Sequence, residues 1–80
     1  DLIETKDDLY FLGTAATLKE AIKIAVAETV EFIEKKRSLD FQDAYRFLSA
    51  TCDIQISQVV NDLVTVRCHL PKFDTGIETL

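Results

Sequence analysis

The sequence predicts one α+β domain, a two-helix hairpin packed on a few β-strands in the order β-α-α-β-β. Three observations support this prediction. Apolar residues recur with helical spacing between residues 17 and 36, the spacing changes to that of a strand after Asp53, and the 80 residues suffice for one small core. The chain holds only two glycines and one proline, so nothing in it marks a linker between domains.

The first strand is expected at residues 9–12, a short apolar run that follows acidic residues. Residues 13–16 are expected to connect it to a helix over about residues 17–36. Thr17 and Glu20 have the spacing of a capping box, in which the threonine hydroxyl accepts a hydrogen bond from the Glu20 amide. The apolar stripe of this helix is broad, which predicts contacts on two of its sides. The stripe comprises Leu18, Ala21, Ile22, Ala25, Val26, Thr29, Val30 and Ile33, with Ile24 and Phe32 at its margins.

A second helix is expected at about residues 41–51, with Asp40 as its N-cap. The short linker makes the two helices neighbours, in an antiparallel or steeply crossed hairpin. The inner face of the second helix is predicted to hold Phe41, Ala44, Tyr45 and Leu48.

Two strands are expected after this helix. From Asp53 the chain alternates apolar and polar residues until the pattern breaks at Val59 and Val60, and Asn61-Asp62 then indicates a turn. Residues 63–70 alternate again, and Pro71 ends that strand because proline has no amide hydrogen to donate. The two strands are expected to form a hairpin, followed by a loose polar tail at residues 73–80.

Charge and composition exclude some classes of partner. The net charge of −5 and the pI of about 4.6 argue against binding to nucleic acid or to an anionic membrane surface. The cationic run Lys35-Lys36-Arg37 lies where the first long helix should end, and cations there favour the helix dipole. The hydrophobic fraction of 48% is high for so small a chain, which indicates apolar faces shared with a partner or with a larger body.

The two cysteines, Cys52 and Cys68, are too far apart for a zinc-binding pair. They could form a disulfide, but the rest of the chain does not resemble a secreted scaffold, so we interpret both as buried thiols in a reducing compartment. No apolar run reaches the length of a membrane span and no signal-peptide pattern is visible. We therefore expect a cytoplasmic protein.

Few residues are candidates for chemistry. Asp53 lies at a helix-to-strand junction, where a carboxylate could act as acid, base or ligand, or could accept backbone hydrogen bonds as Asx side chains do. Gln58 and Asn61 could hold a substrate amide, although a structural role is the simpler interpretation. His69, the one histidine, has no cysteine or paired carboxylates near it in the sequence and is interpreted as a surface or edge residue. The sequence thus shows no self-sufficient active site.

Several pieces of the chain nevertheless occur in a distinctive order. They are Ala44-Tyr45, the block Asp53-Ile54-Gln55-Ile56-Ser57-Gln58-Val59-Val60-Asn61, the valines Val64 and Val66, and Pro71-Lys72. This order resembles the C-terminal end of the acetamidase/formamidase family, in which a block of the form Asp-Leu-(Arg/Lys)-Ile-(Ser/Thr)-Gln-Val-Val-(Asn/Asp) precedes a valine-rich strand ending in Pro-Lys. The chain departs from this pattern at Gln55, where the family usually has a basic residue, and at Thr51-Cys52, which replaces small apolar residues.

The resemblance implies a C-terminal segment of a larger, β-rich amidohydrolase that releases ammonia from formamide or acetamide. The segment alone would be inactive, with no metal of its own, while a divalent metal and the main catalytic groups would belong to the upstream part. Asp53 would take part in the site, with Gln58 and Asn61 as binding or supporting residues. The expected partners are the remainder of the polypeptide, further copies in a homo-oligomer and a small amide substrate. The alternative is a non-enzymatic α+β module that dimerises or binds another protein.

Overall fold

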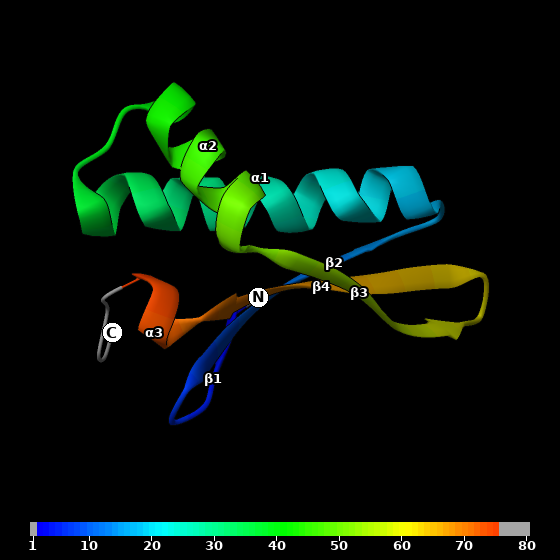
Figure 1. The fold of residues 1–80 in the computed structure, drawn as a ribbon. Coiled ribbons are helices and arrows are strands. Elements are labelled where there is room, and N and C mark those ends of the chain that lie inside the picture. Colours follow the sequence, from blue (N-terminus) through cyan, green and yellow to red (C-terminus); the bar gives the residue numbers. More distant parts are fainter. Residues whose placement is uncertain (1, 76–80) are drawn as a thin grey trace.

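In the computed structural model, which describes residues 2–75, the chain forms two layers, with helices on one face of an antiparallel sheet (Figure 1). The elements in order are β1 (Leu2–Glu4), β2 (Asp8–Ala15), α1 (Leu18–Arg37), α2 (Phe41–Thr51), β3 (Asp53–Val60), β4 (Leu63–Pro71) and α3 (Lys72–Thr75). The predicted α+β class is confirmed, and the structure adds β1 and α3 to the predicted order.

The four strands lie in the order β1-β2-β4-β3, and every neighbouring pair is antiparallel. The hairpin between β3 and β4 turns at Asn61 and Asp62, whose φ angles are 52° and 63°. Positive φ at both central residues belongs to the tight turn that suits the twist of a hairpin, and asparagine and aspartate tolerate it well. The predicted turn is therefore confirmed, and β3 includes Val59 and Val60 because a bulge between Ile56 and Gln58 absorbs the break in alternation.

The core lies between the sheet and α1. Alternation sends every second side chain of β2 and β4 toward the helices, and α1 packs against both strands while α2 packs against α1. In Figure 1, α2 crosses α1 obliquely, as the short linker predicted. The buried apolar residues are Leu9, Phe11, Ala21, Ala25, Val30, Ile33, Ala44, Leu48, Val66, Cys68 and Leu70.

Both helix starts are capped as predicted. The hydroxyl of Thr17 accepts a hydrogen bond from the Glu20 amide at 3.2 Å, and the Asp40 carboxylate accepts one from the Asp43 amide at 2.9 Å. These contacts satisfy amide groups that have no partner within the helix. They explain why α1 begins at Leu18 and α2 at Phe41, within one residue of the predicted starts.

The connection predicted at residues 13–16 is wrong, because β2 continues to Ala15. Gly13 looked like the end of a strand, but it faces α1 inside β2. A Cβ atom there would lie 2.2 Å from the Ala21 carbonyl oxygen and 2.7 Å from the Ala25 nitrogen. The glycine therefore serves the close approach of helix and strand rather than a turn.

The predicted inner face of α2 is only half correct. Ala44 and Leu48 are buried, whereas Phe41 and Tyr45 are 60% and 50% exposed. The reason is that α2 packs mainly against α1, and Phe41 and Tyr45 stay largely outside that contact.

The interpretation of both cysteines as free thiols is also wrong, since Cys52 and Cys68 form a disulfide with their Cα atoms 6.3 Å apart. Ile54 pairs with Cys68 across the sheet, and Cys52 lies two residues before Ile54 on the same side of the chain. The fold therefore brings together two cysteines that the sequence places 16 residues apart. Free thiols were one reason to expect a cytoplasmic location, and that reason no longer applies. The location stays a prediction.

The tail predicted at residues 73–80 begins instead with the short helix α3. Lys72 anchors this point because its backbone amide donates to the Asp7 carbonyl at 2.9 Å and its side chain pairs with Glu4. Residues 76–80 lie outside the described part of the chain. Within residues 2–75, no helix is long and apolar enough to cross a membrane.

Candidate functional site

The face of the sheet opposite the helices carries a row of polar side chains from three strands. Asp8 belongs to β2, His69 and Arg67 to β4, and Asp53 and Gln55 to β3. Their side chains share this face because Asp8 and His69 alternate with the buried Leu9 and Leu70, and because Asp53 and Gln55 are the register partners of His69 and Arg67. We call this row the polar face.

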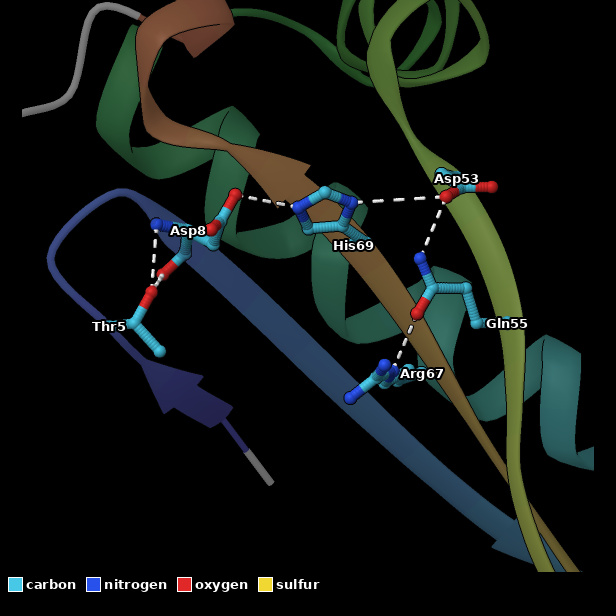
Figure 2. Close-up of polar contacts among 6 residues, drawn as sticks. All are labelled: Thr5, Asp8, Asp53, Gln55, Arg67 and His69. Carbon is cyan, nitrogen blue, oxygen red and sulfur yellow. Dashed lines mark hydrogen bonds and ion pairs between the residues drawn. The ribbon is translucent and has the colours of Figure 1, made fainter.

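His69 is at the centre of the polar face (Figure 2). One ring nitrogen, Nε2, lies 2.7 Å from Oδ1 of Asp8, and the other, Nδ1, lies 3.9 Å from Oδ2 of Asp53. The ring stacks on Tyr10, with centroids 4.9 Å apart and planes inclined by 17°. The histidine is thus fixed on one flat side by an aromatic ring and at its edge by carboxylates.

The interpretation of His69 as a surface or edge residue holds only in part, because His69 lies on the face of the sheet opposite the helices but not at the sheet's edge. Its side chain is only 21% exposed, and β4 is an inner strand of the sheet. Sequence reasoning found no carboxylate near this histidine because Asp8 is 61 residues away along the chain. The pairing of β2 with β4 brings the two side chains together.

A chain of hydrogen bonds continues from Asp53 across the polar face (Figure 2). The Gln55 side-chain amide donates from Nε2 to Asp53 Oδ2 at 2.8 Å, and its Oε1 accepts from Arg67 Nε at 2.7 Å. The Arg67 guanidinium also lies over the Tyr10 ring, with Cζ 4.8 Å from the ring centroid. Gln55 thus connects a cation to a carboxylate, and its amide can serve both because it donates and accepts.

Asp53 is held by these contacts but is not buried. Its side chain is 62% exposed, so the partly buried junction carboxylate considered from the sequence is not what the structure shows. The backbone junction itself is as expected, because Asp53 is the first residue of β3 after α2. An exposed carboxylate next to a histidine can accept a proton or a hydrogen bond from a molecule that reaches this face.

Gln58 and Asn61 lie apart from Asp53. Gln58 is an exposed residue opposite Thr65, and Asn61 is in the turn at the far end of β3. Since a strand rises about 3.3 Å per residue, Asp53 and Asn61 are roughly 25 Å apart. The structure does not gather the three candidate residues into one site, and the positive φ of Asn61 gives it a role in the turn.

Sequence reasoning missed Asp8, Tyr10 and Arg67. The missed pattern was the alternation of Asp8 and Tyr10 with the apolar Leu9 and Phe11, which was interpreted as one continuous buried run. The strand is half-buried instead, with one side facing the helices. A period of two over residues 8–11 would have placed Asp8 and Tyr10 together on the second face.

The polar face offers hydrogen-bonding and proton-accepting groups, but it does not form a complete catalytic centre. Among residues 2–75, no group of three or more histidine, cysteine, aspartate or glutamate side chains could hold a metal ion. A histidine between two carboxylates can be held in one orientation, yet both its ring nitrogens already face side chains of the protein.

Comparison with solved structures shows which proteins the chain resembles. The chain matches the crystal structure of an acetamidase from Bacillus halodurans with a TM-score of 0.86 and 25% identity, over 99% of this chain and 27% of that one. It matches a recombinant predicted acetamidase/formamidase from the thermophile Thermoanaerobacter tengcongensis with a TM-score of 0.79 and 33% identity, over 90% of this chain and 24% of that one. The chain resembles the acetamidase/formamidase family.

An acetamidase from Yersinia enterocolitica shares the same fold, with a TM-score of 0.83 and 23% identity over 92% of this chain and 22% of that one. The chain therefore spans about a quarter of the length of the acetamidase structures that it matches. No protein-family profile matches the chain, and no curated protein matches its sequence.

The structure also shows what the family-like residues form. The block from Asp53 to Asn61 is β3 with the first residue of its turn, and Ala44-Tyr45 lies in α2. Val64 and Val66 are in β4. These family-like residues therefore lie in α2 and the β3–β4 hairpin, whereas the structural match covers 90–99% of the chain. The C-terminal position of this segment stays a prediction.

Proposed function

We propose that this chain is a segment of an amidohydrolase that hydrolyses short aliphatic amides such as formamide or acetamide. The observation that supports this proposal is the similarity of 90–99% of the chain to acetamidase and acetamidase/formamidase structures. The segment alone is inactive, because residues 2–75 hold no complete catalytic centre. Its role is to support the active site and the packing of subunits in a homo-oligomer.

The reaction sets requirements that this segment meets only in part. Water attacks the amide carbon, the C–N bond breaks, and the products are a carboxylate and ammonia. A base must accept the proton from water, and a cation or hydrogen-bond donor must stabilise the negative charge on the carbonyl oxygen. A divalent metal bound by the rest of the protein would supply that stabilisation, since residues 2–75 gather no group of three or more side chains that could hold one.

Asp53 is the contribution of this segment to the site. Its exposed carboxylate is held by Gln55 and lies beside His69, so it is available as an acceptor without rearrangement of the sheet. Gln58, exposed on the same strand, is a hydrogen-bond partner for the substrate or for the surrounding chain. Asn61 supports the strand indirectly through the turn.

The test uses the full reading frame that encodes this chain, assayed for ammonia release from formamide and acetamide. Asp53→Asn is expected to lower kcat/KM at least about tenfold while the melting temperature stays unchanged, since an exposed carboxylate contributes little to stability. Asp43→Asn is the matched control, because Asp43 is also an exposed acidic residue and lies on α2, away from the polar face. Turnover by Asp53→Asn equal to that of the control would remove Asp53 from the site.

A second candidate function is a non-enzymatic module that dimerises or binds a protein. The exposed Phe41, Tyr45, Ile56 and Val59 favour it, since apolar side chains of this size commonly mark an interaction surface. The intact mass of the native protein separates the two candidates. A mass several times the 9.0 kDa of this chain supports the hydrolase, and a mass of 9.0 kDa with self-association supports the module.

A further inference from the structure

An apolar groove runs between α1, α2 and β3. One cavity of about 160 Å³ is lined by residues that include Val26, Tyr45 and Ile54, and a second of about 470 Å³ is lined by Ile22, Val26, Phe41 and Tyr45 among others. The two cavities share Val26 and Tyr45, so they form one continuous surface, which we call the β3 groove. Ile54 is the residue of β3 that lines this groove.

The strand that borders this groove is an open edge. β3 has eight residues and pairs within residues 2–75 only with β4, so the backbone groups along its other side have no strand partner there. The apolar residues Ile54, Ile56 and Val59 are 40%, 61% and 65% exposed. Proteins usually protect such an edge with lysine, proline or a very short strand, because it can otherwise pair with another chain.

The residues of β3 do not provide this protection. β3 contains neither lysine nor proline, and its one charged residue, Asp53, lies at the first position. The rest of the edge has no side chain that would hinder the pairing of another strand.

The bulge in β3 does not protect the edge, because it keeps the apolar residues on one side. Ile56 pairs with Val66 before the bulge and Val59 pairs with Val64 after it, and both of these valines belong to the helix-facing side of β4. Without the extra residue, Val59 would face the opposite side. The bulge thus keeps Val59 on the same side of the strand as Ile54 and Ile56, so these three apolar side chains follow one another along β3 beyond the groove.

We propose that an extended apolar segment from the remainder of the full-length protein adds to the free edge of β3 and covers the β3 groove. This inference rests on the proposed function, because it requires the chain to be part of a longer polypeptide. Backbone hydrogen bonds to β3 would hold the added strand, and its alternate side chains would pack against Ile56, Val59 and Tyr45.

One observation favours this occupant over a second copy of the chain. The matched part makes up only 22–27% of the related structures, so most of such a polypeptide lies outside it and is tethered close to the groove. A tethered segment meets the edge at a high effective concentration, whereas a second copy must bind from solution.

Hydrogen exchange in the full reading frame tests the proposal directly. Alternate amides of β3 point to β4 and to the free edge, so an uncovered edge gives alternating slow and fast exchange. We expect slow exchange at all of them, at every protein concentration. Fast exchange at every second amide overturns the proposal, and so does protection that appears only at high concentration, which would indicate a second copy.

A pair of variants provides an independent readout. Ile56→Lys places a charge on the helix-facing side of β3, two residues from Ile54 in the groove, whereas Val60→Lys, the matched control, places one on the opposite face of the same strand, where Val60 is 51% exposed. We expect Ile56→Lys to lower the melting temperature of the full-length protein by about 5 °C or more, and Val60→Lys by no more than about 2 °C. Shifts of similar small size in both variants would overturn the proposal.

The ammonia-release assay on the same protein keeps the two proposals apart. If the protein hydrolyses amides but the outward amides of β3 exchange fast, the proposal of a covered edge is wrong and the proposed function stands. If the β3 edge is protected but no amide is hydrolysed, the covered edge stands and the proposed activity is wrong.

Discussion

The two faces of the sheet differ in what they contribute. On the helix-facing side, Leu9, Phe11, Val66, Cys68 and Leu70 are at most 3% exposed and pack under α1. On the polar face, no residue of β2, β3 or β4 is fully buried, and the contacts are hydrogen bonds and ring contacts between partly exposed side chains. Stability therefore comes mainly from one face, and the other is left available for function.

This division follows from the alternation of a strand. Neighbouring residues such as Leu70 and His69 point in opposite directions, so a chain can place a core residue and a polar one at consecutive positions. Burial of apolar area contributes roughly 25 cal/mol per Å², whereas exposed ion pairs contribute between 0 and about 1 kcal/mol. Substitutions on the two faces should accordingly differ in cost.

The largest difference in the free energy of unfolding between substitutions on the two faces is expected at Gly13 and Thr14, which are neighbours in β2. Gly13→Ala places a methyl group against the α1 backbone, which cannot move without separating helix and sheet, so we expect a loss of more than about 4 kcal/mol. Thr14→Ala, on the polar face, removes one exposed hydroxyl contact with Thr65 and should cost less than about 1 kcal/mol. Chemical denaturation measures both. A Gly13→Ala protein as stable as Thr14→Ala would contradict the close packing of α1 on β2.

A smaller difference is expected between Leu70 and His69 on β4. Leu70 is fully buried, and Leu70→Ala should cost about 3 kcal/mol through lost burial and the cavity left behind. His69→Ala removes the contact with Asp8 and the stacking on Tyr10, but water reaches the groups left behind, so the cost should be about 1 kcal/mol. Equal unfolding free energies for the two variants would show that the polar face is covered in the protein measured.

The helix-facing side could largely be predicted from the sequence, because local patterns determine it. The 3.6-residue spacing in α1, the caps at Thr17 and Asp40 and the alternation in β4 each act over a few residues, and the structure confirms them. The helix-facing role of Gly13 escaped prediction, since it depends on how closely α1 approaches a strand that precedes it.

The polar face could not be predicted in the same way. The contact of His69 with Asp8 spans 61 residues, and the contact of Arg67 with Gln55 depends on the register of β3 on β4. Similarly, Cys52 and Cys68 meet only after that register is set. A single candidate such as Asp53 can be proposed from its position in the chain, but its neighbours come from strand pairing that no local pattern specifies.

The smallest difference in the free energy of unfolding is expected between substitutions of Arg67 and Arg46. Arg67 lies over the Tyr10 ring and donates to Gln55 on the polar face, so Arg67→Ala should cost about 1 kcal/mol. Arg46 pairs with Asp43 on the surface of α2, where its side chain is 73% exposed, and Arg46→Ala should change the free energy of unfolding by less than about 0.5 kcal/mol. Thermal denaturation at low and high salt separates the two contributions. Because the Tyr10 contact is partly shielded from solvent, the loss in Arg67→Ala should persist at high salt, and its disappearance there would show that charge alone holds Arg67 on the polar face.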